Sequence, residues 1–104
     1  MAIKTTTQTF STPKGLVEGV KVEWSTFSIL LMTAPHGFLA CGIFDITAIN
    51  TFGRAAALVE STPDNPIGTL ERFMERRVSA VNEKAREKGI TIGMSTSEAL
   101  ELLF

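Results

Sequence analysis

The chain has 104 residues, of which 44% are hydrophobic and 20% are charged, and its formal net charge is −1. This length fits one domain with a single hydrophobic core, and the composition is too apolar and too nearly neutral for a disordered chain. We therefore expect one domain over residues 1–104 and exclude an intrinsically disordered protein.

The first 24 residues predict two strands. Thr dominates residues 3–10, and the Ser-Thr-Pro-Lys-Gly run that follows has turn chemistry. Residues 16–24 alternate apolar side chains with Lys21 and Glu23, which is the period of a strand with one solvated face.

Residues 27–33 and 38–44 are apolar at both odd and even positions. This pattern is typical of central strands that are covered on both faces. Pro35-His36-Gly37 lies between them and predicts a hairpin turn, because proline fixes one backbone angle and glycine accepts a positive φ.

A short helix is predicted after the central strands, over residues 46–52. Asp45 can cap it, and Gly53 can end it in the left-handed conformation. Residues 54–59 are ambiguous, because their three alanines favour a helix while their place after a glycine stop suits a strand. We predict a strand there and a surface loop over residues 60–66.

The last third predicts two helices. Apolar residues recur at three- and four-residue spacing and predict one long amphipathic helix over residues 69–89. A short extended piece is expected over residues 90–92. Ser95 and Glu98 then form a capping-box pattern, which predicts a helix through Leu103.

These elements predict an α+β fold. The expected architecture is a two-layer sandwich, in which a mostly antiparallel sheet of five or six strands carries three helices on one face. Three helices cannot cover both faces of the central strands, so the second face must meet another copy, a ligand or water. We expect a homo-oligomer; the alternative is a monomer whose sheet curls around its own side chains.

Basic residues gather in one stretch of the second half, where they alternate with glutamates. The basic members are Arg72, Arg76, Arg77, Lys84, Arg86 and Lys88, and the acidic members are Glu71, Glu75, Glu83 and Glu87. This alternation is typical of a solvated mixed-charge surface and not of a stripe that neutralises phosphates. We expect no nucleic-acid partner.

Cys41 is the single cysteine, and the N-terminal residues lack the basic and apolar pattern of a secretory signal. Both observations predict a cytoplasmic protein. Residues 24–44 carry no formal charge and are long enough to cross a bilayer, but Pro35-His36-Gly37 in their middle indicates a turn between two strands. We therefore predict no membrane partner.

Residues with reactive or charged side chains lie near the ends of the central strands. Candidate site residues are His36, Cys41, Asp45 and Arg54, with Gly37, Gly42 and Gly53 as backbone and turn positions. Arg54 can hold a carboxylate or phosphate, or it can form an internal ion pair with Asp45. A small anionic ligand near Asp45 and Arg54 is therefore one expectation.

The sequence leaves two functions open: a self-associating assembly or binding domain, which we prefer, and an enzyme. In the enzyme, Cys41 would be the nucleophile or His36 the acid or base. These residues are about 16 Å apart in one extended strand, so their site would be shared between subunits. No Walker loop, dinucleotide-binding glycine motif, serine elbow or zinc-ligand spacing occurs, and we expect no cofactor and no metal.

The motifs around these residues resemble a known family. They are His36-Gly37-Phe38-Leu39-Ala40-Cys41-Gly42-Ile43-Phe44-Asp45, then Asn50 and Gly53-Arg54, and later Gly89-Ile90, Gly93-Met94-Ser95 and Glu98-Ala99-Leu100. Over roughly residues 15–104 the chain is similar to the YunC-like family of uncharacterised bacterial and archaeal proteins. The resemblance implies an α+β two-layer fold and an unassigned function, and it supplies no catalytic residues.

Overall fold

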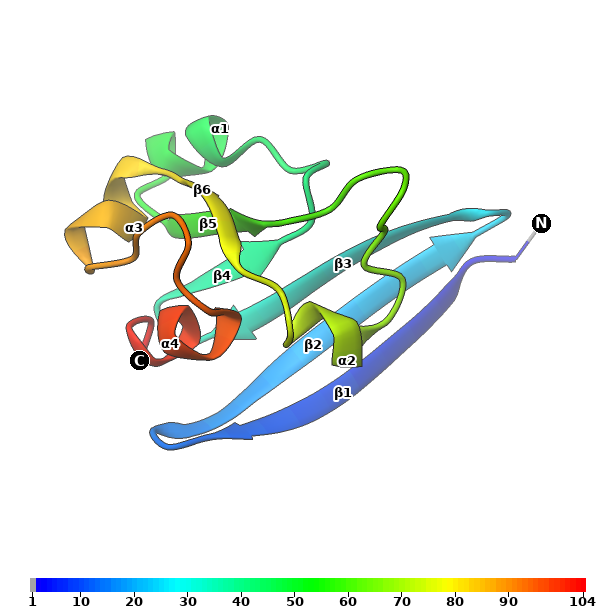
Figure 1. Cartoon of the computed structure of the whole chain (residues 1–104), viewed down its shortest axis with the longest axis horizontal. Coiled ribbons are helices and arrows are strands. Elements are labelled where there is room, and N and C mark those ends of the chain that lie inside the picture. The colour runs from blue at the N-terminus through cyan, green and yellow to red at the C-terminus, as the bar shows by residue number, and fades with distance from the viewer. Residues whose placement is uncertain (1) are drawn as a thin grey trace.

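A computed structural model describes residues 2–104 and has an α+β fold. A mostly antiparallel, open sheet of six strands packs with four short helices (Figure 1). The elements are β1 Lys4–Thr12, β2 Gly15–Trp24, β3 Phe27–Ala34, β4 Gly37–Ala40, α1 Ile46–Thr51, β5 Ala55–Val59, α2 Leu70–Phe73, β6 Val78–Val81, α3 Glu83–Glu87 and α4 Thr96–Glu101. The α+β class and the mostly antiparallel six-stranded sheet predicted from the sequence are confirmed.

The first four strands form an antiparallel meander in chain order. Two-residue turns join them, and Pro35-His36 is the turn between β3 and β4, as predicted. At the first turn Thr12 Oγ1 donates to Gly15 O at 2.7 Å and accepts from Lys14 N at 3.2 Å. Short turns of this kind fix the register of the strands, and β1 pairs with β2 at nine consecutive positions.

A parallel crossover joins β4 to β5 through α1. Asp45 Oδ1 accepts hydrogen bonds from Thr47 N and Ala48 N, both at 3.1 Å, and Gly53 follows the helix with φ +74°. The predicted cap, the predicted left-handed stop and the strand over residues 54–59 are therefore confirmed, although the strand begins at Ala55.

The long helix predicted over residues 69–89 is wrong. This segment forms α2, then the strand β6 and then α3. Thr69 caps α2, and β-branched Val78 and Val81 belong to the strand that pairs with β5. The three- and four-residue spacing identified residues that share a core, since Phe73 and Ala85 are fully buried, but tertiary pairing overrode the helix.

Two smaller predictions also change. The strand expected over residues 38–44 ends at Ala40, and residues 90–92 form no strand. Ser95 caps α4 by accepting from Glu98 N at 3.2 Å, as the capping-box pattern predicted, although the helix ends at Glu101.

The strand register defines two faces of the sheet. The inner face carries Met32 and Leu39, which are 0% exposed and belong to one core cluster with Leu70 of α2, Ala85 of α3 and Leu100 of α4. The helices α2, α3 and α4 thus pack toward this face, and α1 contacts β5. The three helices predicted from the sequence are corrected to four, because the segment predicted as one long helix holds two short ones.

Two glycines let the layers approach closely. A Cβ at Gly19 would lie 2.9 Å from Leu70 Cδ2, so any larger residue would make the Leu70 side chain shift where α2 crosses β2. A Cβ at Gly37 would lie 2.5 Å from Ala55 O, and Gly37 does not have a positive φ. The role predicted for Gly37 is therefore corrected: close strand packing, rather than a left-handed turn, requires it.

Candidate functional site

The four candidate residues do not form one site. Cys41 lines a groove near the β2–β3 turn, while His36 and Arg54 line a separate hollow beside the β3–β4 turn. Asp45 lines neither of them and caps α1. Within one chain the structure therefore separates Cys41 from His36 and Arg54 from Asp45.

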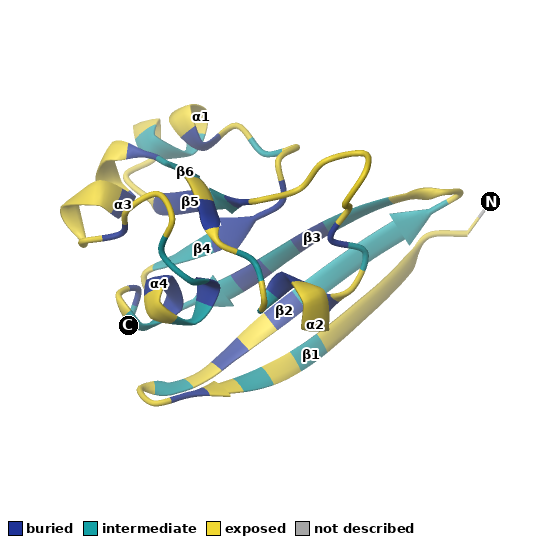
Figure 2. Ribbon diagram, in the orientation of Figure 1, coloured by how far each residue is buried: buried dark blue, intermediate teal, exposed yellow. Residues whose placement is uncertain are grey.

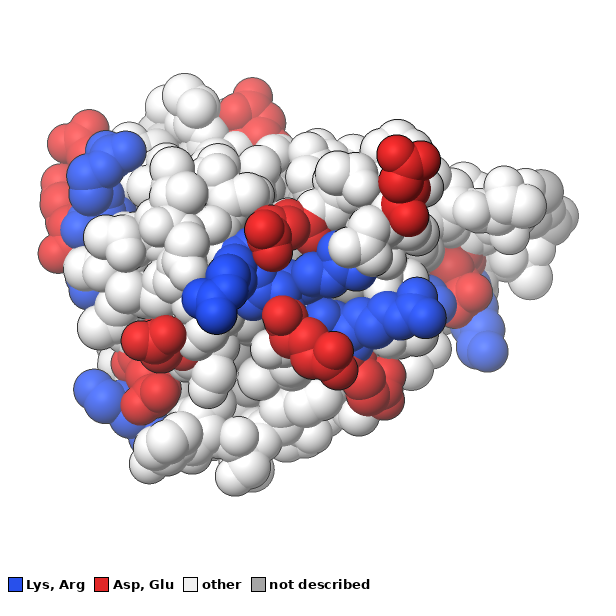
Figure 3. All heavy atoms as spheres, in the orientation of Figure 1, with Lys and Arg blue, Asp and Glu red and all other residues white. Residues whose placement is uncertain are grey.

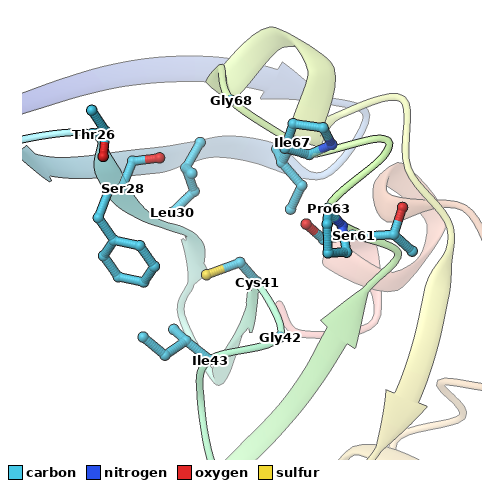
Figure 4. A pocket seen from close by; sticks show the side chains of 13 residues that line it. Thr26, Ser28, Leu30, Cys41, Gly42, Ile43, Ser61, Pro63, Ile67 and Gly68 are labelled. Atoms are coloured by element: carbon cyan, nitrogen blue, oxygen red, sulfur yellow. The ribbon is translucent and has the colours of Figure 1, made fainter.

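The groove at Cys41 has a volume of about 460 Å³. Its lining residues come from the β2–β3 turn, the start of β3, the segment after β4 and the loop after β5: Thr26, Phe27, Ser28, Leu30, Cys41, Gly42, Ile43, Ser61, Thr62, Pro63, Pro66, Ile67 and Gly68. Figure 4 shows the Cys41 side chain directed into the space between Leu30 and Ile43.

The chemistry of this groove is hydroxylic and apolar. Cys41 is 8% exposed, and its backbone N donates to Leu30 O at 3.0 Å. None of the other lining residues has an ionisable side chain. A cysteine nucleophile needs an adjacent base or cation, and the residues that line this groove supply neither.

Arg76 holds the loop that forms one wall of the groove. Its Nη1 donates to Glu60 O at 3.1 Å and to Asn65 O at 2.9 Å. Its Nη2 donates to Asn65 Oδ1 at 3.1 Å and to Pro66 O at 3.0 Å. This role was not predicted from the sequence, where Arg76 was one charge of a mixed-charge surface. A loop with two prolines has few N–H donors of its own, which indicates that its carbonyl groups need a donor from elsewhere in the chain.

The hollow beside the β3–β4 turn has a volume of about 410 Å³. It is lined by Thr33, Ala34, Pro35, His36, Gly37, Phe38 and Arg54. The ion pairs found in residues 2–104 join Lys21 to Glu23 and Lys84 to Glu87, so the internal Asp45–Arg54 pair does not form there. The hollow therefore has one unpaired guanidinium and one imidazole among its lining residues.

Asn82 fixes the backbone that carries Arg54. This side chain is 5% exposed and makes four hydrogen bonds. Its Oδ1 accepts from Ala56 N at 3.2 Å and Ala85 N at 2.9 Å, and its Nδ2 donates to Ile46 O and Arg54 O, both at 3.0 Å. Sequence reasoning missed Asn82 as well, although an Asn directly before a helix is a common cap.

The outer face of the sheet is apolar over the ends of β2 and β3 that lead to the β2–β3 turn, and the pair Glu18–Thr33 on the same face is its polar border. We define the outer face as the surface that carries Val20, Val22, Trp24, Phe27, Ile29, Leu31 and Phe38. Cross-strand pairs join Val20 to Leu31, Val22 to Ile29 and Trp24 to Phe27. All seven side chains are half-buried or exposed, and the Trp24 and Phe27 rings meet edge to face at 5.4 Å.

The opposite side of the same strands is polar where the helices do not reach. Figure 1 shows the ends of β2 and β3 near the N-terminus extending beyond the helices. On the helix side of this extension lie Lys21, Glu23 and Ser28, with Lys21 Nζ 3.5 Å from Glu23 Oε2. The alternation predicted from Lys21 and Glu23 therefore places the solvated side toward the helix layer and the apolar side on the outer face.

The helix side of the molecule presents charges of both signs. Figure 3 shows basic side chains bordered by acidic ones over the centre of this side. Arg72 and Arg76 line a polar hollow together with Glu60, Asp64 and Glu75. No helix in residues 2–104 is long and apolar enough to cross a membrane, and this part of the chain contains no group of three or more potential metal ligands.

Three comparisons relate the chain to proteins without an assigned activity. The pattern of a family described as a domain of unknown function, DUF1805, matches residues 40–103. The uncharacterized protein YunC of Bacillus subtilis (strain 168) is 25% identical over 81 residues, which cover 78% of this chain and 79% of YunC. A crystal structure of a protein of unknown function, TA1206 from Thermoplasma acidophilum, superposes with a TM-score of 0.84 at 16% identity, covering 100% of this chain and 97% of that one.

Proposed function

The chain belongs to the DUF1805 family of domains of unknown function, and we propose that it is a cytoplasmic assembly domain whose outer face packs against a second copy of itself. No specific activity follows from the names of its relatives. The cytoplasmic part of the proposal is supported by a single, buried cysteine, which has no disulfide partner within the chain.

The distribution of side chains on the extended part of β2 and β3 carries this proposal. At the end of this extension the polar residues Lys21, Glu23 and Ser28 lie on the helix side, where Leu30 is the buried apolar residue, and the large apolar residues Val22, Trp24, Phe27 and Ile29 lie on the outer face. Val22 and Leu31 face outward, while Lys21 and Glu23 face the helix side. A monomer would gain nothing from this arrangement, whereas a partner on the outer face would bury the apolar side.

The composition of the outer face fits a protein interface. Stable interfaces are enriched in aromatic residues at their centre. Trp24 and Phe27 are aromatic, and Phe27 is 47% exposed. In a dimer with a two-fold axis, the same residues of both subunits would form the interface. Each Å² of apolar surface removed from water would contribute about 25 cal/mol to the free energy of association.

The experiment is a measurement of native mass on wild type and on a Val22→Thr/Leu31→Thr variant. Threonine keeps the strand propensity but makes the outer face polar. We expect the mass of the assembly to fall by half in the variant. Lys21→Thr is the matched control, because it changes the adjacent residue on the other side of β2, and it should leave the mass unchanged.

A second candidate function is binding of a small anion in the hollow beside the β3–β4 turn. The supporting observation is that Arg54 and His36 line the same hollow and that Arg54 is in no ion pair with another described residue. The Asp45 carboxylate already accepts hydrogen bonds from the amides at the start of α1, so these amides are not free to bind an anion. The anion would instead bind the Arg54 guanidinium.

The enzyme hypothesis requires the second copy. Because the groove at Cys41 has no base among its lining residues, a catalytic His36 would have to come from the partner subunit. Thiol reactivity separates the two functions: an assembly domain has an unreactive Cys41, and the enzyme has a thiol that reacts faster than a free cysteine.

A further inference from the structure

Strand β1 is an open edge of the sheet. It is the first strand in the order of the sheet and pairs only with β2. Within residues 2–104, no element other than β2 makes a backbone hydrogen bond to residues 4–12. Because hydrogen-bonded and non-hydrogen-bonded pairs alternate in an antiparallel ladder, about half of the β1 amides and carbonyls point away from β2. The edge is thus a row of free backbone donors and acceptors.

The edge lacks the features that normally prevent pairing with another chain. Natural edge strands are short or bulged, or they carry charges and prolines. β1 has nine residues in unbroken register with β2, no proline, and one charged residue, Lys4, at its beginning. Figure 2 shows β1 as mostly exposed.

The opposite edge of the same sheet is protected by its short length, by a register shift and by a segment that covers its free side. β6 has four residues, and its pairing with β5 contains a register shift between Leu58 and Val59. The chain also covers its free side, because Val78 N donates to Met94 O and Gly93 N donates to Val78 O, both at 2.8 Å. The fold therefore closes one edge and leaves the longer one open.

We propose that β1 pairs with the β1 strand of a second copy, antiparallel and centred on Gln8, so that two sheets form one continuous sheet. This register overlaps all nine residues of β1 and keeps the outer faces of both copies on the same side. It sets Thr7 opposite Thr9 of the partner subunit, which is a favourable β-branched pair. It sets Lys4 opposite Thr12 of the partner subunit, so no like charges meet.

This interface is independent of the one proposed above. Its two-fold axis passes through the sheet at Gln8 and leaves the outer face free. If both interfaces form, two continuous sheets pack through their outer faces and give a closed assembly of four subunits.

The test is disulfide cross-linking of two single-cysteine variants in a Cys41→Ser background. In Gln8→Cys, the two new cysteines lie directly opposite one another, with Cα atoms about 4.5–5.5 Å apart, which permits a disulfide. In Thr6→Cys, the matched control, they lie about 13 Å apart along the strands and cannot be bridged. We expect most of the Gln8→Cys protein and little of the Thr6→Cys protein to form a linked dimer under mild oxidation.

Random collisions would give the reverse order, because Thr6 is exposed and Gln8 is only half-exposed. Equal or faster cross-linking of Thr6→Cys would therefore overturn the proposal, as would the absence of a link in Gln8→Cys. Both variants should keep the melting temperature of the Cys41→Ser parent in reductant, which shows that they fold.

Adding Val22→Thr/Leu31→Thr to the Gln8→Cys variant separates the two proposals. Cross-linking that persists in this background supports the β1 interface without the outer face. Its loss there contradicts an edge interface that forms independently. If the Val22→Thr/Leu31→Thr substitutions halve the native mass and the Gln8→Cys variant forms no disulfide-linked dimer, the outer-face assembly alone is supported and β1 pairing is overturned.

Discussion

The two halves of the sheet meet the same requirement, burial of apolar residues on the outer side, in different ways. In β4 and β5 the outward residues alternate between the small Ala40 and Ala56, which are 0% exposed, and the half-buried Phe38 and Leu58, and α1 contacts β5. In β2 and β3 the corresponding residues are large, such as Val22 and Leu31, and they remain half-exposed. Small residues let the chain pack against itself, whereas large residues without a helix over them present a surface to a partner.

The segment between β4 and α1 covers part of the outer side of β4. Phe44 precedes α1 and packs edge to face on Phe38 of β4, with ring centroids 6.0 Å apart. We therefore expect contacts within one subunit to stabilise the β4–β6 half and contacts with a second copy to contribute part of the stability of the β1–β3 half.

The largest effect is expected from Asn82→Ala in the half that covers itself. This change leaves four backbone groups of α1, β5 and α3 without their partner in a buried place, and it should lower the free energy of unfolding by about 3 kcal/mol or more. Urea unfolding monitored by circular dichroism measures it. Asn82→Asp keeps an acceptor for Ala56 N and Ala85 N but turns a carboxylate oxygen toward Ile46 O and Arg54 O, so it should not restore the stability. A loss below about 1 kcal/mol in Asn82→Ala would remove Asn82 from this role.

A smaller effect is expected from Arg76→Ala, which removes the four hydrogen bonds to the loop after β5. Because the guanidinium is partly exposed, the loss of unfolding free energy should be about 1–2 kcal/mol. Arg76→Lys should not restore it, since lysine cannot make the forked contacts. Arg72→Ala is the neighbouring control and should change stability by less than about 0.5 kcal/mol.

The reaction rate of Cys41 with a thiol reagent distinguishes a groove that is only a packing feature from an active site. If the groove is only a packing feature, a thiol reagent should modify native Cys41 at least about tenfold more slowly than free cysteine, and denaturant should remove the difference. The reaction is followed by absorbance or by mass. A native rate above that of free cysteine would favour the enzyme hypothesis over the assembly domain.

The smallest effect concerns the hollow at Arg54. Millimolar inorganic phosphate should raise the melting temperature of the wild type by about 1–2 °C, as expected for a weakly bound anion that favours the folded state. Arg54→Gln should abolish this shift, while Arg72→Gln should keep it. A shift that survives in Arg54→Gln would place the anion elsewhere.

Local sequence chemistry predicted the first half of the fold well. The turn at Pro35-His36, the Asp45 cap and the Gly53 stop depend on residues close in sequence, and all three are confirmed. The prediction of one helix over residues 69–89 was wrong because strand pairing with β5 and hydrogen bonds of the Asn82 side chain decide the conformation of this segment. Neither interaction can be recognised from the spacing of apolar residues.

The candidate site shows the same limit. Its residues were placed correctly at the ends of strands, but the sequence could not show that Cys41 and His36 line different hollows. All the Arg76 side-chain contacts, and all those of Asn82 except the cap on Ala85 N, cross at least ten residues of sequence, so residue type alone did not reveal them.

Sedimentation of the wild-type chain beside Val22→Thr/Leu31→Thr and Lys21→Thr tests the outer face most directly. The account predicts that wild type and Lys21→Thr sediment as the same assembly at micromolar concentration and that the double variant sediments with half that mass while staying folded. A wild-type protein that sediments as a monomer, with a melting temperature that does not depend on its concentration, would contradict the assembly domain.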